Sequence, residues 1–156
     1  MIAKKYSIIT LIFLLTSCGF KVIDYSKLNN FKIESIQTNG ENSINYRLKN
    51  KIKVISNEQS NNLVKLTIFS RKINNIKEKN IKNEITKYEL EIITKVSYEV
   101  LNNNIQESFE INVTGDYPVG QKYSNTIKNQ ANTLETLTDE VAILIKRKLS
   151  QSLNDL

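Results

Sequence analysis

The chain has 156 residues and a formal net charge of +6, with 40% hydrophobic and 24% charged residues, a composition typical of a folded globular domain. It contains one cysteine, four glycines and no histidine, so it cannot assemble a Cys/His zinc site or a histidine-dependent catalytic triad. The scattered glycines also form no phosphate-binding loop. The composition therefore argues against an enzyme, and we expect no nucleic-acid partner.

The N-terminal segment has the pattern of a secretory signal peptide. Lys4 and Lys5 precede an apolar run, Ile8–Leu15, which is too short to cross a bilayer because a span needs about 20 apolar residues. The alternative, a buried N-terminal helix, does not account for how the segment ends. It ends in Leu-Thr-Ser and then the only cysteine, Cys18, which resembles a bacterial lipobox with cleavage between Ser17 and Cys18.

Lipidation of Cys18 has consequences for location and redox state. It occupies the only thiol, so the mature protein has no disulfide, and we expect no cofactor apart from this covalent lipid. Two or more acyl chains give lasting membrane attachment. The next residue is Gly19 rather than aspartate, which resembles default sorting to the outer membrane. We therefore predict a protein anchored by lipid to the periplasmic side of the outer membrane.

Behind the signal peptide of residues 1–17, residues 18–30 form a lipidated tether, and residues 31–156 form a single α+β domain. The pattern predicts a first strand ended by Asn39-Gly40, then a helix with apolar residues every three or four positions. A second alternating strand follows, and a Lys/Asn-rich segment without periodicity is predicted to be a mobile loop. These elements span Phe31–Gln37, Asn42–Ser56, Leu63–Ile73 and Asn74–Asn83.

The second half of the domain contains the clearest patterns. Residues Tyr88–Val100 alternate strictly, which predicts a long strand with one buried and one solvated face. An Asn102–Asn104 turn leads into a return strand, Ile105–Tyr117, in which Gly115 marks a bulge or a bend. A final helix, Ser124–Leu153, carries an apolar stripe that begins at residues 127 and 131.

The order strand, helix, three strands, helix predicts a two-layer α+β sandwich. About four mainly antiparallel strands form the sheet, and both helices pack on its apolar face. The closing helix packing on this sheet is favoured over a coiled coil with a partner.

The sequence is similar to a known family in several stretches. A lipobox is followed at once by Gly19-Phe20, and the matching stretches of the domain are Lys95–Val100, Phe109–Gly115, Tyr123–Thr126, Ala131–Ala142 and Ile145–Leu149. These resemble the long strand pair and the closing helix of the lipopolysaccharide-assembly outer-membrane lipoproteins, the LptE-like family. The resemblance implies a lipoprotein that sits as a plug inside a large outer-membrane β-barrel and helps that barrel to mature. Together the two proteins would insert lipopolysaccharide into the outer leaflet.

Two partners follow from this resemblance, the barrel protein and lipopolysaccharide. Lys65, Arg71 and Lys95 project from predicted solvated strand faces and are candidates to bind lipopolysaccharide phosphates through charge-assisted hydrogen bonds. The simpler interpretation is ordinary solvated charge.

Two other functions remain open. The first is an accessory lipoprotein of another periplasmic lipid-transport system. The second, an enzyme, rests only on scattered carboxylates, which are more simply explained as solubilising groups that pair with lysines across the hairpin. These carboxylates belong to Glu89, Glu91, Glu99, Glu107 and Glu110.

Overall fold

The computed structural model describes residues 31–54 and 56–154. The predicted signal peptide, the cleavage site between Ser17 and Cys18 and the tether of residues 18–30 lie outside them. The described elements, in chain order, are β1 (Lys32–Gly40), α2 (Asn42–Val54), β2 (Leu63–Lys79), β3 (Ile85–Val100), β4 (Ile105–Pro118) and α3 (Tyr123–Asn154).

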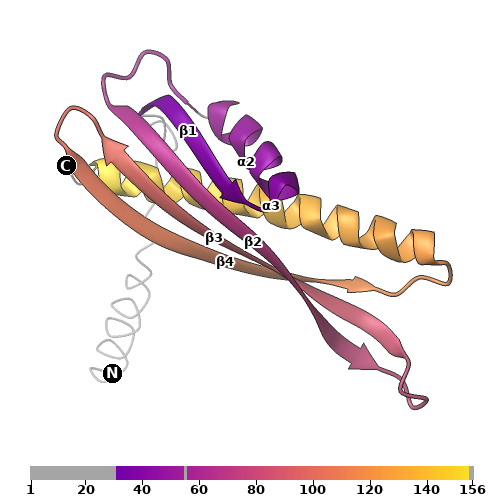
Figure 1. The fold of residues 1–156 in the computed structure, drawn as a ribbon. Helices are drawn as coiled ribbons and strands as arrows, with labels where there is room; N and C mark the ends of the chain where they lie inside the picture. Colours follow the sequence, from indigo (N-terminus) through magenta and orange to yellow (C-terminus); the bar gives the residue numbers. More distant parts are fainter. Residues whose placement is uncertain (1–30, 55, 155–156) are drawn as a thin grey trace, which may run out of the picture.

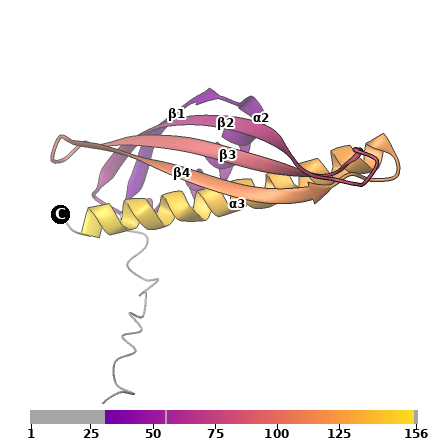
Figure 2. The ribbon, with the colours of Figure 1, turned by 90° about the horizontal axis from the view of Figure 1, so that it is seen from below.

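The four strands form one sheet in the order β1-β2-β3-β4. Strands β2, β3 and β4 are antiparallel neighbours, whereas β1 pairs with β2 in parallel, because α2 carries the chain back between them. Both helices lie on one side of the sheet (Figure 1), with α2 against β1 and β2 and α3 along β4 and β3 (Figure 2). The predicted two-layer α+β sandwich is confirmed.

Strand β1 is longer than predicted and contains an irregularity. The predicted strand ended at Gln37, but β1 continues through Asn39 to Gly40. The register with β2 shifts between Ile33 and Ser35, and this bulge places one extra residue in β1. As a result, Ile33 and Ile36 are three residues apart and still both face the helices, where Ile36 is buried.

The core lies between the helix-facing side of the sheet and the two helices. On β3, the alternate residues from Leu90 to Val100 are buried, as the strict alternation predicted. The helices contribute Ile44, Leu48 and Ile52 from α2 and Val141, Ile145 and Leu149 from α3, all with no exposed surface. The apolar stripe of α3 begins later than predicted, because residues 127 and 131 are exposed beyond the edge of this core.

The prediction of a mobile loop at Asn74–Asn83 is wrong, because most of these residues belong to a strand. Strand β2 continues to Lys79 and pairs with β3 almost to its beginning at Ile85, so that only a short turn at Asn80–Glu84 connects them. The paired ends, residues 77–87, reach past the last residue of β4, Pro118, which pairs with Lys87, and project beyond the helices as a two-stranded arm, at the lower right of Figure 1. Because no helix covers the arm, neither of its faces needs an apolar alternation, and the sequence pattern gives no strand signal there.

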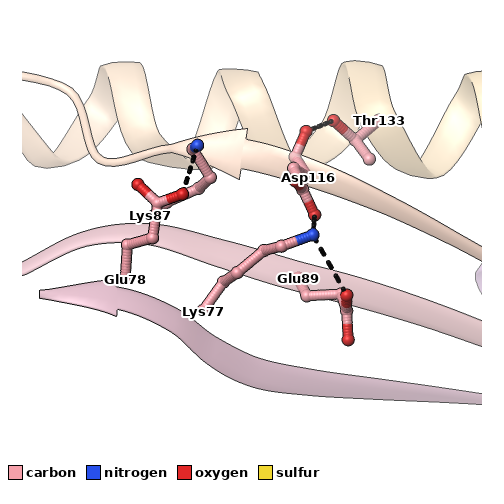
Figure 3. A network of polar contacts seen from close by, with 6 residues as sticks. All are labelled: Lys77, Glu78, Lys87, Glu89, Asp116 and Thr133. Atoms are coloured by element: carbon pink, nitrogen blue, oxygen red, sulfur yellow. Dashed lines mark hydrogen bonds and ion pairs between the residues drawn. The ribbon is translucent and has the colours of Figure 1, made fainter.

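Charged side chains join the arm to the neighbouring strand (Figure 3). The Lys77 Nζ atom lies 2.8 Å from Asp116 Oδ1 on β4 and 3.4 Å from Glu89 Oε2 on β3. Lys87 also pairs with Glu78 across the hairpin, at 2.7 Å. The hydrogen bond to Asp116 is the largest cause of a raised pKa at Lys77. The folded state therefore favours the protonated Lys77 ammonium. The stabilisation that its ion pairs give is present at neutral pH and is lost as the pH rises through the raised pKa of Lys77.

We expect Lys77→Gln to loosen the arm without unfolding the domain. The substitution removes both ion pairs of Lys77 but no core contact, and exposed ion pairs contribute little to global stability. Trypsin should then cleave faster after Lys79 and Lys82, whereas the melting temperature should change little. Lys128→Gln, an exposed change on α3, is the control. Equal cleavage rates in both variants would show that the ion pairs do not hold the arm.

Gly115 does not form the predicted bulge, because β3 and β4 pair without a register shift. It serves instead as a point of close approach for α3. A Cβ atom at this position would lie 3.1 Å from Leu137 Cδ2 and 3.2 Å from Thr133 Cγ2. The glycine thus lets α3 pack tightly over β4.

Candidate functional site

The face of the sheet opposite the helices, here called the open face, has no covering layer in the described part of the chain. It contains a shallow hollow of about 660 Å³ across all four strands. Leu66, Tyr98 and Glu107 are among its eleven lining residues, and the other eight carry polar or charged side chains at paired positions of the ladder. These are Ser35 and Gln37 on β1, Lys65 and Thr67 on β2, Ser97 and Glu99 on β3, and Gln106 and Ser108 on β4.

The three predicted lipopolysaccharide-binding residues all lie exposed on the open face. Arg71 is directly opposite Ile93, and Lys95 is directly opposite Phe69, so Arg71 and Lys95 are diagonal neighbours about 7–8 Å apart at their Cα atoms. Lys65 lies opposite Glu99, and Glu99 is about 13 Å along β3 from Lys95. The structure therefore brings Arg71 and Lys95 together and leaves Lys65 separate, in the hollow.

Two apolar residues of this site were missed by the sequence analysis. Phe69, 48% exposed, and the half-buried Ile93 lie between Arg71 and Lys95 in the ladder. Together these four residues form what we call the basic–apolar patch. Ile93 interrupts an otherwise polar series on the outer face of β3, and this interruption was the available signal. Apolar side chains next to a guanidinium and an ammonium suit an amphiphile with an anionic head group.

The carboxylates of the hairpin do not converge on a reaction centre. Glu89 pairs with Lys77, and Glu91 accepts a hydrogen bond of 2.7 Å from Asn112. Glu107 differs from the other four glutamates, because it does not lie on the open face. It lies on the helix side, where the Tyr98 hydroxyl donates a hydrogen bond to it.

Tyr98 belongs to the edge of the core rather than to a site. Burial raises the pKa of its phenol, and the hydrogen bond to Glu107 raises it further. Nearby, Lys148 on α3 lies 5.1 Å from the ring centre of Phe109, a cation–π contact that ties the helix to β4. The Lys148 contact therefore fastens α3 to β4, and the Tyr98 hydrogen bond joins β3 to β4.

The described residues contain no group of three or more acidic, cysteine or histidine side chains placed to hold a metal ion. Neither described helix has the length and apolar character needed to cross a membrane. Ser17 and Cys18, the predicted cleavage and lipidation sites, lie outside the described residues.

The fold resembles those of solved bacterial lipoproteins. A protein described as a lipoprotein from Caulobacter crescentus superposes with a TM-score of 0.58 at 16% sequence identity, covering 83% of this chain and 94% of that one. An uncharacterized lipoprotein B from Nitrosomonas europaea also gives 0.58, at 15% identity, covering 87% and 93% of the two chains. No protein-family model and no curated protein sequence matches the chain. These similarities establish the fold.

Proposed function

We propose that this chain is an outer-membrane lipoprotein that plugs and helps to assemble a β-barrel translocon, which inserts lipopolysaccharide into the outer leaflet. In this proposal the protein is not an enzyme. It acts by shape and charge, anchored through Cys18 to the inner leaflet of the outer membrane. The observation that carries the proposal is the combination of a lipobox with a domain fold shared by bacterial lipoproteins over more than nine-tenths of their length.

The shape and surface of the domain support a role inside a barrel. Helix α3 has 32 residues, so it is about 48 Å long at 1.5 Å per residue, comparable with the 40–45 Å of a bilayer and its head groups. The interior of an outer-membrane barrel is polar, and some barrels are plugged. The polar open face of the sheet is suited to contact such a wall, and the basic–apolar patch is suited to contact lipopolysaccharide.

The test is to identify the partner and then to remove the lipoprotein. The tagged protein, purified from membranes in mild detergent, should carry a large outer-membrane β-barrel with it. Depletion should leave that barrel misassembled and lipopolysaccharide absent from the cell surface. Recovery of an inner-membrane permease, with normal surface lipopolysaccharide after depletion, would instead favour an accessory role in another lipid-transport system.

Cys18→Ala should abolish anchoring altogether. Without the thiol there is no site for the thioether-linked lipid, so the precursor should keep its signal peptide and run at higher mass. It should also incorporate no radioactive fatty acid, whereas the wild-type protein should be labelled and trimmed. Labelling and trimming of the variant would refute the lipobox.

The electrostatic part of the proposal can be tested apart from the plug role. Changing Lys65, Arg71 and Lys95 together to glutamine should leave the fold and the barrel association intact, because exposed charges contribute little to folding. Binding of lipopolysaccharide should weaken by about tenfold or more at low salt, each lost charge-assisted contact counting for about 1.5–3 kcal/mol at most.

The position of Lys65 provides an internal control for this experiment. Because Lys65 lies apart from the basic–apolar patch, Lys65→Gln alone should have a smaller effect than Arg71→Gln and Lys95→Gln together. Unchanged binding in the triple variant would remove these residues from the site and leave the plug role standing.

A further inference from the structure

An apolar groove, here called the helix groove, lies on the helical side of the domain, away from the open face. It has a volume of about 310 Å³ and is lined by Lys51 and Val54 on α2 and by Asp139, Ala142, Ile143 and Lys146 on α3. Val54 is 85% exposed and Ile143 is 66% exposed. Two large aliphatic side chains this exposed, beside each other on packed helices, form a small surface suited to a covering segment.

The groove results from the way the two helices pair. Arg47 binds Glu135 at 3.2 Å, and Lys51, one turn later, binds Asp139 at 2.5 Å. The helices thus run in the same direction with ion pairs at successive turns. One turn further, Val54 and Ile143 occupy the corresponding positions, so the row of ion pairs gives way to an apolar gap where α2 ends.

The chain enters the domain close to this gap. The backbone oxygen of Phe31 accepts a hydrogen bond of 2.9 Å from the Asn57 amide, and the Ile33 amide donates one of 2.9 Å to Ser56 Oγ. Both partners directly follow the end of α2. The preceding segment, Phe20–Tyr25, contains four of the tether's apolar residues, and its last residue can lie up to about 20 Å from Phe31.

We propose that the tether segment Phe20–Tyr25 docks in the helix groove. The volume is at the lower end of the range of about 300–1,000 Å³ for ligand pockets, which suits a few side chains better than a lipid. Charge also matches, because Asp24 is the only acidic residue of the tether. Lys146, at the rim of the groove, has no ion pair with any residue of 31–54 or 56–154.

Docking would shorten the free chain between the lipid anchor and the domain. The thirteen tether residues can extend to about 43 Å, but only the stretch from Cys18 to Phe20, about 7 Å of chain, would remain free beyond the groove. The end of the domain that carries the groove would then be held close to the lipid anchor, and the open face would stay uncovered. The docking itself depends neither on the barrel partner nor on lipopolysaccharide, so its failure would leave the proposed function unaffected.

A disulfide formed in living cells tests the contact. Ile23→Cys combined with Ile143→Cys should form an intrachain disulfide in the oxidising periplasm, because the lipidated Cys18 offers no competing thiol. Ile23→Cys combined with Ile127→Cys is the control, since Ile127 is also exposed but lies 16 residues, about 24 Å, earlier on α3. Disulfide in the first pair alone is the expected result, and equal yields in both pairs would contradict docking.

Trypsin provides an independent measurement on the purified, lipidated protein. Lys21 and Lys27 are cleavage sites within the tether, and docking should shield them. Ile23→Asn, and separately Val54→Glu with Ile143→Glu, should accelerate cleavage there by about tenfold, because cleavage tracks the population of the undocked form. Ile23→Asn changes no residue of the described domain, so unfolding cannot explain its effect. Unchanged cleavage in both variants, with no 23–143 disulfide, would overturn the proposal.

Discussion

Replacing Val96 by aspartate should unfold the domain, whereas the same replacement at the adjacent Ser97 should leave it folded. Val96 has no exposed surface and lies on the helix-facing side of β3, where the new carboxylate would find no partner. An unpaired buried charge costs several kcal/mol, against about 5–15 kcal/mol for the stability of a whole domain. Ile92→Asp should behave in the same way, because Ile92 is buried on the same face, four residues earlier on β3.

The control works because neighbouring residues of a strand point to opposite faces. Ser97 lines the polar hollow of the open face, so an aspartate there stays in water and should lower the melting temperature only slightly. Circular dichroism during heating would distinguish the variants. Equal losses for Val96→Asp and Ser97→Asp would contradict the register of β3.

The strand β3 and the turn after it could be predicted because their signals are local. Burial of one face dictates strict alternation from Leu90 to Val100, and a turn needs residues that tolerate left-handed angles, as Asn104 does with a φ of 53°. The helices were predicted for the same reason, since an amphipathic period is visible within a few turns.

The arm could not be predicted from the sequence because its order depends on pairing rather than burial. Each strand of the arm offers its neighbour backbone hydrogen bonds and charged side chains, as between Lys87 and Glu78, and these leave no apolar period. Likewise, the bulge in β1 between Ile33 and Ser35 shifts the alternation by one residue, and only the parallel partner reveals it.

For the candidate site, the sequence predicted which side of the strands its residues lie on but not how far apart they lie. The alternation of β2 and β3 placed Lys65, Arg71 and Lys95 on solvated faces. Their spacing, however, depends on the register in which Phe69 opposes Lys95, and a shift of two residues that set Arg71 opposite Glu91 would separate Arg71 from Lys95. The helix groove depends in the same way on how residues of α2 align with residues of α3 far along the chain.

Gly40→Ala should be the most damaging of the conservative substitutions at the glycines. Gly40 ends β1 with a φ of +92°, in the left-handed region, which costs an L-residue about 1–2 kcal/mol. A Cβ atom there would also collide with the backbone oxygen of Ser70. That oxygen accepts a hydrogen bond of 2.8 Å from Glu41, at the entrance to α2, so the chain cannot relieve the collision without separating β1 from β2 or displacing α2.

Gly115→Ala is the matched control for this prediction. Its added methyl group would meet side-chain atoms of Leu137 and Thr133 at 3.1–3.3 Å, and side chains can shift by the few tenths of an ångström required, whereas the Ser70 backbone is held in the sheet. Urea unfolding should therefore show a loss of several kcal/mol for Gly40→Ala and a clearly smaller one for Gly115→Ala. A loss at Gly115 as large as that at Gly40 would mean that the contact of α3 with β4, rather than the β1–α2 corner, is the less adaptable part of the fold.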